Sequence, residues 1–195
     1  MNKPKDSLPP SYFEDLYRTN PDPWKFETSD YEAQKYQTTI NALPKSYYSN
    51  AFEIGGSIGV LTALLAQHCD SLLSVDVSEI AQQRAIARCQ NLPQVRFEIA
   101  QVPQDYPNEM FDLTVLSEVG YYLNWDDLKK TQQLIIEHLE IGGHLLLVHW
   151  TLPVPTYPLT GDLVHDSFLA LNDPRLQHLK GLRQEKYRLD LFERI

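Results

Sequence analysis

The most constraining feature of this chain is a glycine-rich turn between a short apolar strand and a helix. Residues 51–54 (AFEI) have the composition of a buried strand, and residues 60–66 (VLTALLA) have apolar side chains at helical spacing. Gly55, Gly56 and Gly59 lie between the two. Because glycine has no Cβ, such a turn can adopt positive φ and lets a ligand lie against the main chain. This order of strand, turn and helix predicts an α/β fold with a nucleotide-type cofactor site.

A second apolar strand, residues 72–75, runs into Asp76. Asp76 follows Gly55 by 21 residues, close to the separation of about 20 expected for a carboxylate that binds ribose hydroxyls. Glycine also occurs in strand-to-helix connections for steric reasons alone. With an acidic residue at this spacing, cofactor binding is the better interpretation of the turn.

The glycine pattern separates two kinds of cofactor. A dinucleotide site favours G-x-G-x-x-G, because the pyrophosphate rests against the helix N-terminus. Here the turn reads GGSIG from Gly55 to Gly59, so Ser57 stands in place of the second glycine and narrows the room for a pyrophosphate. A nicotinamide-dependent oxidoreductase is therefore the less favoured alternative.

The same turn, preceded by Glu53, resembles motif I of the class I S-adenosylmethionine-dependent methyltransferases. The resemblance runs from Phe52 to Trp150, with residues 111–118 (FDLTVLSE) similar to the fourth strand and residues 139–148 (LEIGGHLLLV) similar to the turn into the fifth. It implies a Rossmann-like α/β fold with a seven-stranded, mostly parallel sheet, an antiparallel last strand and helices on both faces. It also implies S-adenosylmethionine as cofactor and S-adenosylhomocysteine as product.

One position departs from that family. After the third strand, residues 95–100, the resemblance leads us to expect an acidic residue for the adenine amine, and the chain has Gln101, with Asp105 as a substitute. A glutamine amide can accept from the amine and donate to a ring nitrogen. For Glu53, the alternative to a supporting role near the cofactor is a strand-end carboxylate held by local N–H groups. The cofactor residues implied by the resemblance are Glu53, Gly55, Gly56, Ser57, Gly59, Asp76, Val77, Gln101, Val102, Ser117 and Glu118.

Two further segments are similar to one branch of the family, the nodulation protein S group. These are DPWKFETSDYE (residues 22–32) and SEVGYYL (residues 117–123). Members of that group methylate the free amine of a deacetylated chitin-type oligosaccharide, so the resemblance implies an N-methyltransferase for an amine or amino-sugar acceptor. Related sites are reused on many acceptors, so the acceptor and the choice between N- and O-methylation remain open. A non-catalytic S-adenosylmethionine-binding protein is a further alternative.

Methyl transfer requires an acceptor lone pair in line with the methyl carbon and, for a protonated amine, prior removal of a proton. Glu118, at the end of the fourth strand, is our first candidate for the base or amine-orienting carboxylate, and His149, at the end of the fifth, is the second. Glu118 has two alternative roles, binding the positive methionine end of the cofactor or capping the next turn. The alternative for His149 is a hydrogen-bonded structural histidine.

We expect the ends of the chain to determine the acceptor. Residues 11–43 predict one or two helices that lie over the cofactor as a lid, with Ser29 or Asp30 as a cap, residues 50–150 form the cofactor-binding core, and residues 151–195 supply an acceptor-pocket loop, a helix capped by Asp162 and the final strands. Aromatic and histidine side chains are candidates to contact the acceptor through stacking or cation–π interactions, although each also suits a packing role. They are Trp24, Tyr31, Tyr121, Tyr122, Trp150, Tyr157 and His165.

Composition agrees with one globular domain over residues 1–195, with 43% hydrophobic and 22% charged residues. The net charge of −9 argues against a nucleic-acid substrate, which needs a basic surface. No leader pattern or apolar run of about 20 residues is evident, so we expect a cytoplasmic protein that acts on a small molecule without membrane contact. Cys69 and Cys89 lack metal-ligand or disulfide spacing, which predicts free thiols and no metal. The oligomeric state is open.

Overall fold

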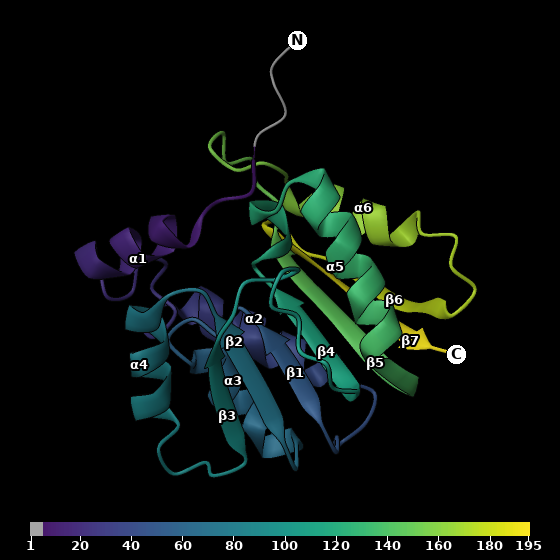
Figure 1. Cartoon of the computed structure of the whole chain (residues 1–195), viewed down its shortest axis with the longest axis horizontal. Coiled ribbons are helices and arrows are strands. Elements are labelled where there is room, and N and C mark those ends of the chain that lie inside the picture. Colours follow the sequence, from purple (N-terminus) through teal and green to yellow (C-terminus); the bar gives the residue numbers. More distant parts are fainter. Residues whose placement is uncertain (1–5) are drawn as a thin grey trace. The chain divides into compact units, whose positions relative to one another are not determined.

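In the computed structural model, which describes residues 6–195, strands and helices alternate in the order that the sequence predicts (Figure 1). The residues fall into two units. The N-terminal unit is Pro9–Gln101, and the C-terminal unit is Val102–Ile195 with residues 6–8.

The N-terminal unit contains three parallel strands in the order β3-β2-β1. A helix follows each of the first two strands, because parallel neighbours need a crossover connection. Strands β1 and β2 are buried almost throughout, whereas β3 alternates between partly buried and exposed side chains. The elements are β1 (Ala51–Ile54), α3 (Val60–Leu65), a 3₁₀ turn η1 (Ala66–His68), β2 (Leu72–Asp76), α4 (Glu79–Arg88) and β3 (Val95–Ile99).

Two helices precede β1, as the sequence predicts for residues 11–43. Helix α1 (Pro10–Thr19) has Pro10 in its first turn, where the missing N–H has no cost. Helix α2 (Asp30–Asn41) is capped by Ser29, whose hydroxyl accepts from the Glu32 N–H. Helix α1 contacts α4, so this segment packs on the same unit that holds the glycine turn.

The C-terminal unit contains four strands in the order β4-β5-β7-β6. Strands β4 and β5 are parallel, while β7 is antiparallel to both β5 and β6. The predicted antiparallel final strand is therefore confirmed, and β6 joins it as a hairpin partner. The elements are β4 (Phe111–Ser117), a 3₁₀ turn η2 (Gly120–Tyr122), α5 (Trp125–His138), β5 (Leu139–Trp150), α6 (Gly161–Leu169), β6 (Leu176–Arg183) and β7 (Tyr187–Arg194).

The core of this unit consists of the β4 and β5 side chains, on which α5 and α6 pack. Leu113, Leu116 and Leu146 are fully buried, and burying each such side chain contributes about 1.5–3 kcal/mol. Helix α6 begins differently from the prediction: the Thr160 hydroxyl, and not the Asp162 side chain, caps it by accepting from the Leu163 N–H. Asp162 lies in the first helical turn and pairs with Arg183 instead.

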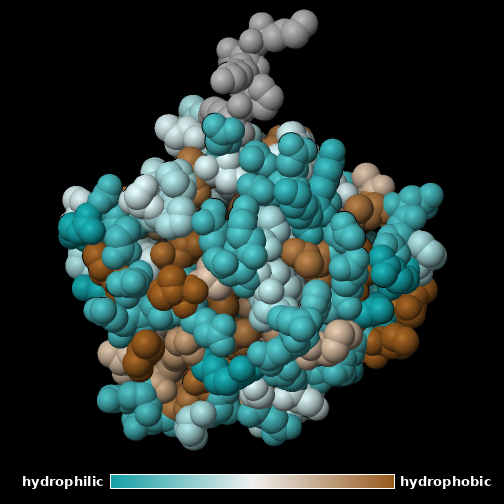
Figure 2. All heavy atoms as spheres, viewed as in Figure 1, coloured by the Kyte–Doolittle hydropathy of each residue, from teal (hydrophilic) through white to brown (hydrophobic). Residues whose placement is uncertain are grey.

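The strand order, β3-β2-β1 followed by β4-β5-β7-β6, is that of a seven-stranded, mostly parallel sheet, as predicted. Both cysteines are buried free thiols, in agreement with the sequence. Within residues 6–195, no helix has the length and apolar run needed to cross a membrane. On the face shown in Figure 2, small hydrophobic areas interrupt a mostly hydrophilic surface.

Candidate functional site

The glycine turn between β1 and α3 has the unusual backbone expected of it. Gly55 and Gly59 have φ of 87° and 80°, and Ser57, which carries a Cβ, has φ of 51°. Gly56 is required for a different reason: a Cβ there would lie 2.0 Å from Ser74 Oγ on β2. Because strained conformations of residues such as Ser57 persist only where the surroundings impose them, the turn is a candidate ligand cradle.

Asp76 connects the two turns that follow β1 and β2. Its Oδ2 accepts from the Ser57 N–H at 2.8 Å, and its Oδ1 accepts from the Ser78 N–H at 2.9 Å. Burial raises the pKa of Asp76, and the backbone N–H donors oppose that effect. Since a carboxylate has about four acceptor positions and the backbone donors are Ser57, Val77 and Ser78, Asp76 keeps capacity for a further hydroxyl donor.

Glu53 lies beneath the turn with 1% of its surface exposed. Its Oε2 accepts from Thr62 Oγ1 at 2.5 Å and from Ser74 Oγ at 2.7 Å. Burial raises its pKa to about 7, although both hydroxyls favour the charged form. Side-chain hydroxyls, and not the backbone N–H groups of the alternative interpretation, therefore hold this carboxyl group. One of these hydroxyls belongs to Ser74, the residue against which Gly56 packs.

Helix α1 adds two contacts that the sequence did not reveal. The Tyr17 hydroxyl is hydrogen-bonded to Ser57 Oγ, and Glu14 Oε2 accepts from Ser78 Oγ at 2.5 Å. Burial, together with the nearby Asp76, raises the pKa of Tyr17. Glu14 and Tyr17 are three residues apart and so share one helix face, which is the only sequence signal that relates them. This face covers the turns on either side of Asp76.

The aromatic candidates of the N-terminal unit, Trp24 and Tyr31, contact other side chains of that unit. The half-buried Trp24 meets Tyr17 edge-on at 5.8 Å between centroids and stacks on Phe26 at 5.4 Å. The Tyr31 ring faces Lys35 Nζ at 5.8 Å from its centroid. These contacts fit the packing role, and an additional contact with an acceptor stays a prediction.

The adenine candidates lie at the boundary of the N-terminal unit. Gln101 is half-buried, and Asp105, the substitute, is exposed. Val77 is half-buried directly after Asp76, whereas Val102 is buried. Their contacts with a cofactor also remain predictions.

In the C-terminal unit, Glu118 follows β4 with φ of 58°, which, like that of Ser57, lies in the left-handed region. Its Oε2 accepts from the Tyr121 hydroxyl at 2.6 Å and from the Trp150 N–H at 2.8 Å. These two bonds fix the orientation of a half-buried carboxylate, preceded by the buried Ser117, at the end of the strand where ligands of parallel sheets bind.

Three of the predicted aromatic residues lie together beside this carboxylate. The Tyr121 ring stacks on Tyr157 at 5.2 Å between centroids, and Tyr122 meets both rings edge-on at 4.6 and 4.8 Å. Both Tyr121 and Tyr122 are buried, and burial, with the nearby Glu118 and Tyr157, raises their pKa values well above the usual range. They are therefore neutral phenols, and Tyr121 donates its proton to Glu118.

The contacts of His149 fit its alternative interpretation, a hydrogen-bonded structural histidine, and those of His165 fit a packing role. Both side chains are completely buried. His149 Nε2 accepts from the Gly120 N–H at 3.0 Å, and its Nδ1 lies 3.0 Å from His165 Nε2. The remaining nitrogen of His165 lies 2.6 Å from Asp190 Oδ2. Because every ring nitrogen is hydrogen-bonded inside the protein, His149 lacks the free lone pair of a base, and His165 has no polar atom left for an acceptor.

One protein-family model matches most of the chain. The family model for nodulation protein S (NodS) covers residues 14–147. The chain belongs to the nodulation protein S family. Nodulation protein S of Rhizobium tropici is 31% identical over 127 residues, which make up 64% of this chain and 53% of that relative. This chain thus spans about half the length of that relative.

Solved structures confirm the class I methyltransferase fold. The N-methyltransferase NodS from Bradyrhizobium japonicum WM9, crystallised with S-adenosylhomocysteine, has a TM-score of 0.82 and 24% identity over 93% of this chain and 97% of that chain. A Pseudomonas syringae protein assigned as a methyltransferase is 34% identical, with a TM-score of 0.73 over 84% of this chain and 99% of that chain.

The matched range of the NodS family divides the candidate residues. It includes the glycine turn, Asp76, Glu118 and Tyr121, and it ends before His149, Tyr157 and His165. The candidate residues His149, Tyr157 and His165 therefore lie outside the matched range.

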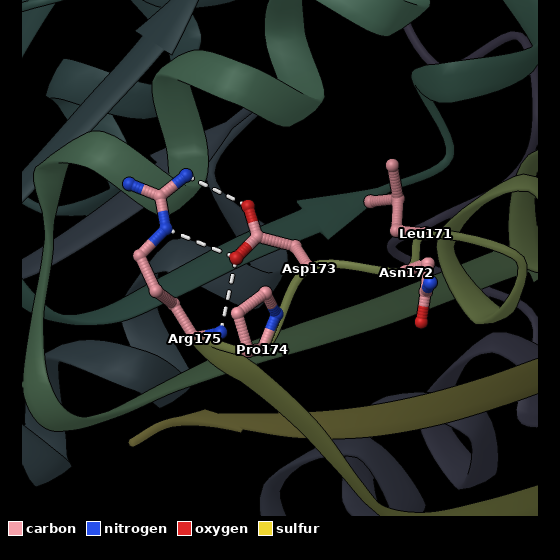
Figure 3. A pocket seen from close by; sticks show the side chains of 5 residues that line it. All are labelled: Leu171, Asn172, Asp173, Pro174 and Arg175. Atoms are coloured by element: carbon pink, nitrogen blue, oxygen red, sulfur yellow. Dashed lines mark hydrogen bonds and ion pairs between the residues drawn. The ribbon is translucent and has the colours of Figure 1, made fainter.

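A separate surface hollow of about 520 Å³ lies between α6 and β6 (Figure 3). It is lined by residues 171–175, and Asp173 accepts from Arg175 Nε and one terminal guanidinium nitrogen at 3.0 and 2.7 Å. This ion pair satisfies the two charged side chains within the hollow. None of the predicted site residues lines it.

Proposed function

We propose that this NodS-family chain is an S-adenosylmethionine-dependent methyltransferase that transfers a methyl group to the amine of a small molecule of the amino-sugar type. The single observation that carries the proposal is the Asp76 carboxylate, which is hydrogen-bonded to the backbone of the glycine turn and retains capacity for a further donor. Family membership and the fold support the same function.

The residues of the N-terminal unit fit S-adenosylmethionine better than a dinucleotide. Asp76 would accept from the ribose hydroxyls, and the turn from Gly55 to Gly59 would lie against the methionine and ribose parts. Ser57 carries a hydroxyl where a dinucleotide site needs a glycine, and that hydroxyl is engaged with Tyr17. Gln101 would face the adenine amine. When bound, the cofactor supplies an electrophilic methyl carbon on its sulfonium.

The C-terminal unit supplies the groups suited to the acceptor. Glu118 is held by the Tyr121 hydroxyl and the Trp150 N–H, so its carboxylate has a defined direction before the acceptor arrives. A fixed carboxylate can orient an ammonium group and take its proton, which frees the lone pair for attack. We assign this role to Glu118 and not to His149.

An amine is favoured over a neutral hydroxyl acceptor by the chemistry around Glu118. A carboxylate attracts a cation, and the half-buried Tyr157, which packs on the buried Tyr121 and Tyr122, provides aromatic surface for cation–π contact or for stacking on a sugar ring. The B. japonicum relative is described as an N-methyltransferase. The net charge of −9 also favours a neutral or cationic acceptor over a nucleic acid.

Calorimetric titration with S-adenosylmethionine, S-adenosylhomocysteine and NAD tests the cofactor. We expect both sulfur ligands to bind, and Asp76→Asn to weaken binding by about tenfold or more, because a hydrogen bond to a charged group contributes roughly 1.5–3 kcal/mol. Asp70→Asn is the matched control, since Asp70 is an exposed carboxylate just before β2, at its opposite end. Tight NAD binding without a response to either sulfur ligand would contradict the proposal.

Release of S-adenosylhomocysteine during incubation with candidate acceptors tests catalysis. Deacetylated chitin-type oligosaccharides, simple amines and hydroxylated sugars are the three arms. We expect turnover with an amine, and Glu118→Gln to lower kcat while S-adenosylhomocysteine affinity stays within about twofold. Binding without turnover in any arm would favour the non-catalytic alternative, and turnover of the hydroxylated sugars alone would refute N-methylation.

A further inference from the structure

Asp190 on β7 collects three side-chain donors at a site where only 2% of its surface is exposed. Its Oδ2 accepts from His165 Nδ1 at 2.6 Å and from Arg188 Nε at 2.8 Å, and its Oδ1 accepts from His178 Nε2 at 2.7 Å. These bonds favour the charged carboxylate and keep the pKa of Asp190 below its usual value despite burial. Asp190 is therefore a permanent acceptor within the fold.

The directions of the hydrogen bonds between Asp190 and Gly120 follow from their two ends. The Gly120 N–H can only donate, so His149 Nε2 must accept and the proton of His149 must reside on Nδ1. That proton points to His165 Nε2, so the proton of His165 must also reside on Nδ1, from which it is donated to Asp190. Both histidines are thereby held neutral and in the same tautomer. A second proton on either ring would face another donor.

Two glycines allow neighbouring elements to approach His149 closely. A Cβ on Gly120 would lie 3.0 Å from His149 Nε2 and 2.7 Å from Val164 Cγ1. A Cβ on Gly161 would lie 3.0 Å from His149 Cβ. The absence of these side chains lets η2 and α6 pack close to His149.

The hydrogen-bond chain that starts at Asp190 leads to Glu118 and Tyr121, the residues proposed to contact the acceptor. Gly120 begins η2, whose next residue, Tyr121, donates to Glu118 Oε2. On β5, the residue after His149 is Trp150, whose N–H donates to the same oxygen. Both backbone segments that contact Glu118 are thus attached to His149, one by the Gly120 hydrogen bond and the other by covalent sequence.

We propose that His149, His165 and Asp190 are positioning residues for methyl transfer: a directed hydrogen-bond chain that holds the Glu118–Tyr121 turn in its strained, working conformation. The inference rests on the proposed function, because it assigns Glu118 to the acceptor. None of the three residues touches the acceptor. Their effect is on the placement of the carboxylate, and a displacement of about 1 Å at such a group can lower turnover on the order of a hundredfold.

Long-range ¹H–¹⁵N correlation spectra of the imidazole rings test the chain without any acceptor. We expect His149 and His165 to give the pattern of the Nδ1–H tautomer. His178, whose Nε2 donates to the same carboxylate, is an internal contrast with a proton on Nε2. An Nε2–H tautomer, or a doubly protonated ring at neutral pH, for either His149 or His165 would overturn the inference.

Substitution of His165 tests the consequence for turnover. His165→Leu removes both the acceptor and the donor, and we expect it to lower kcat by about tenfold to a hundredfold, with acceptor KM and S-adenosylhomocysteine affinity within about twofold. His165→Gln keeps an amide oxygen and an N–H at a similar separation, and it should regain most of the loss. The matched control is the same pair of substitutions at His138, a half-buried histidine of α5 that does not belong to this hydrogen-bond chain.

The outcomes separate the two proposals. A folded His165→Leu variant with unchanged kcat, or Leu and Gln variants that lose kcat equally, refutes the positioning role. If His165→Leu does not fold, the tautomers of the unaltered protein decide. If the unaltered protein methylates no acceptor, the proposed function fails, and the tautomers still decide whether the directed chain exists.

Discussion

Gly56 and Ser74 offer a sharp test of how the glycine turn is built. In Gly56→Ala the new methyl group would lie 2.0 Å from Ser74 Oγ and 3.3 Å from Glu53 Oε2. Ser74 must then move, which breaks its 2.7 Å bond to Glu53. Overpacking costs about 1–3 kcal/mol, and loss of the hydrogen bond costs about 1 kcal/mol, so we expect a loss of roughly 2–4 kcal/mol in the free energy of unfolding.

The double variant distinguishes this clash from a general intolerance of the turn. Ser74→Ala alone should cost about 1 kcal/mol, because Thr62 still donates to Glu53. With Ser74 Oγ removed, the nearest remaining atoms are Glu53 Oε2 at 3.3 Å and Ser74 Cβ at 3.4 Å, so the new methyl group requires only a small shift of the Glu53 side chain. Gly56→Ala combined with Ser74→Ala should therefore cost about 1–2 kcal/mol, less than the sum of the single changes, with a coupling of about 2 kcal/mol.

Urea unfolding, followed by circular dichroism, measures the free energy of unfolding of the unaltered protein, the two single variants and the double variant. For a chain of this size, 1 kcal/mol corresponds to roughly 2–4 °C in Tm, so Gly56→Ala alone should lower Tm by roughly 5–15 °C. S-adenosylhomocysteine titration provides a second measurement, in which the double variant should bind more tightly than Gly56→Ala. Additive free energies would show that the contact with Ser74 Oγ is not what requires glycine.

Three further predictions concern neighbouring groups. The pKa of Glu53 is raised to about 7, so the folded state binds the proton more strongly than the unfolded state does. Its free energy of unfolding should therefore fall, relative to that of Glu53→Gln, by on the order of 3 kcal/mol as pH rises from about 4.5 through 7. If urea unfolding at pH 5 and pH 7.5 gives the same change for both proteins, this prediction is wrong. Gly120→Ala should lower kcat by about tenfold or more, since its Cβ would meet Val164 Cγ1 at 2.7 Å. Adding Val164→Ala to this variant should restore part of kcat. Steady-state kinetics without any recovery in the double variant would refute the role of this contact. Tyr17→Phe should lower the free energy of unfolding by about 1 kcal/mol through loss of the bond to Ser57, and a value equal to that of the unaltered protein would show that this hydroxyl bond contributes nothing.

The parts of the fold that the sequence predicted well are those with a local signal. The helices before β1, the cap at Ser29, the glycine turn and Asp76 at the end of β2 are all short-range patterns of burial, capping and φ. The cap of α6 was wrong by two residues, because Thr160 and Asp162 are both good capping residues and the pairing of Asp162 with Arg183 on β6 is not visible in the local sequence.

The candidate site shows the same division. Three of the seven residues that the sequence offers for the acceptor, Tyr121, Tyr122 and Tyr157, lie together, and Tyr121 donates to Glu118. The sequence does not predict the contacts of Glu14 with Ser78 and of Tyr17 with Ser57, because they join residues 64 and 40 positions apart. A helical face predicts that two side chains point the same way, but not which turn they cover.

By itself, the sequence determined that a strand, a glycine turn and a helix precede a strand ending in Asp76, because φ requirements and hydrophobic period are written into consecutive residues. The kind of cofactor followed from the resemblance of that turn to motif I of the class I methyltransferases. Only the tertiary structure decided what His149 does. Its partners are the Gly120 N–H, 29 positions before it, and His165, 16 positions after it, and His165 in turn meets Asp190 after another 25. The folding of β4, β5, α6 and β7 into one unit brings these groups together, although they are far apart in the sequence.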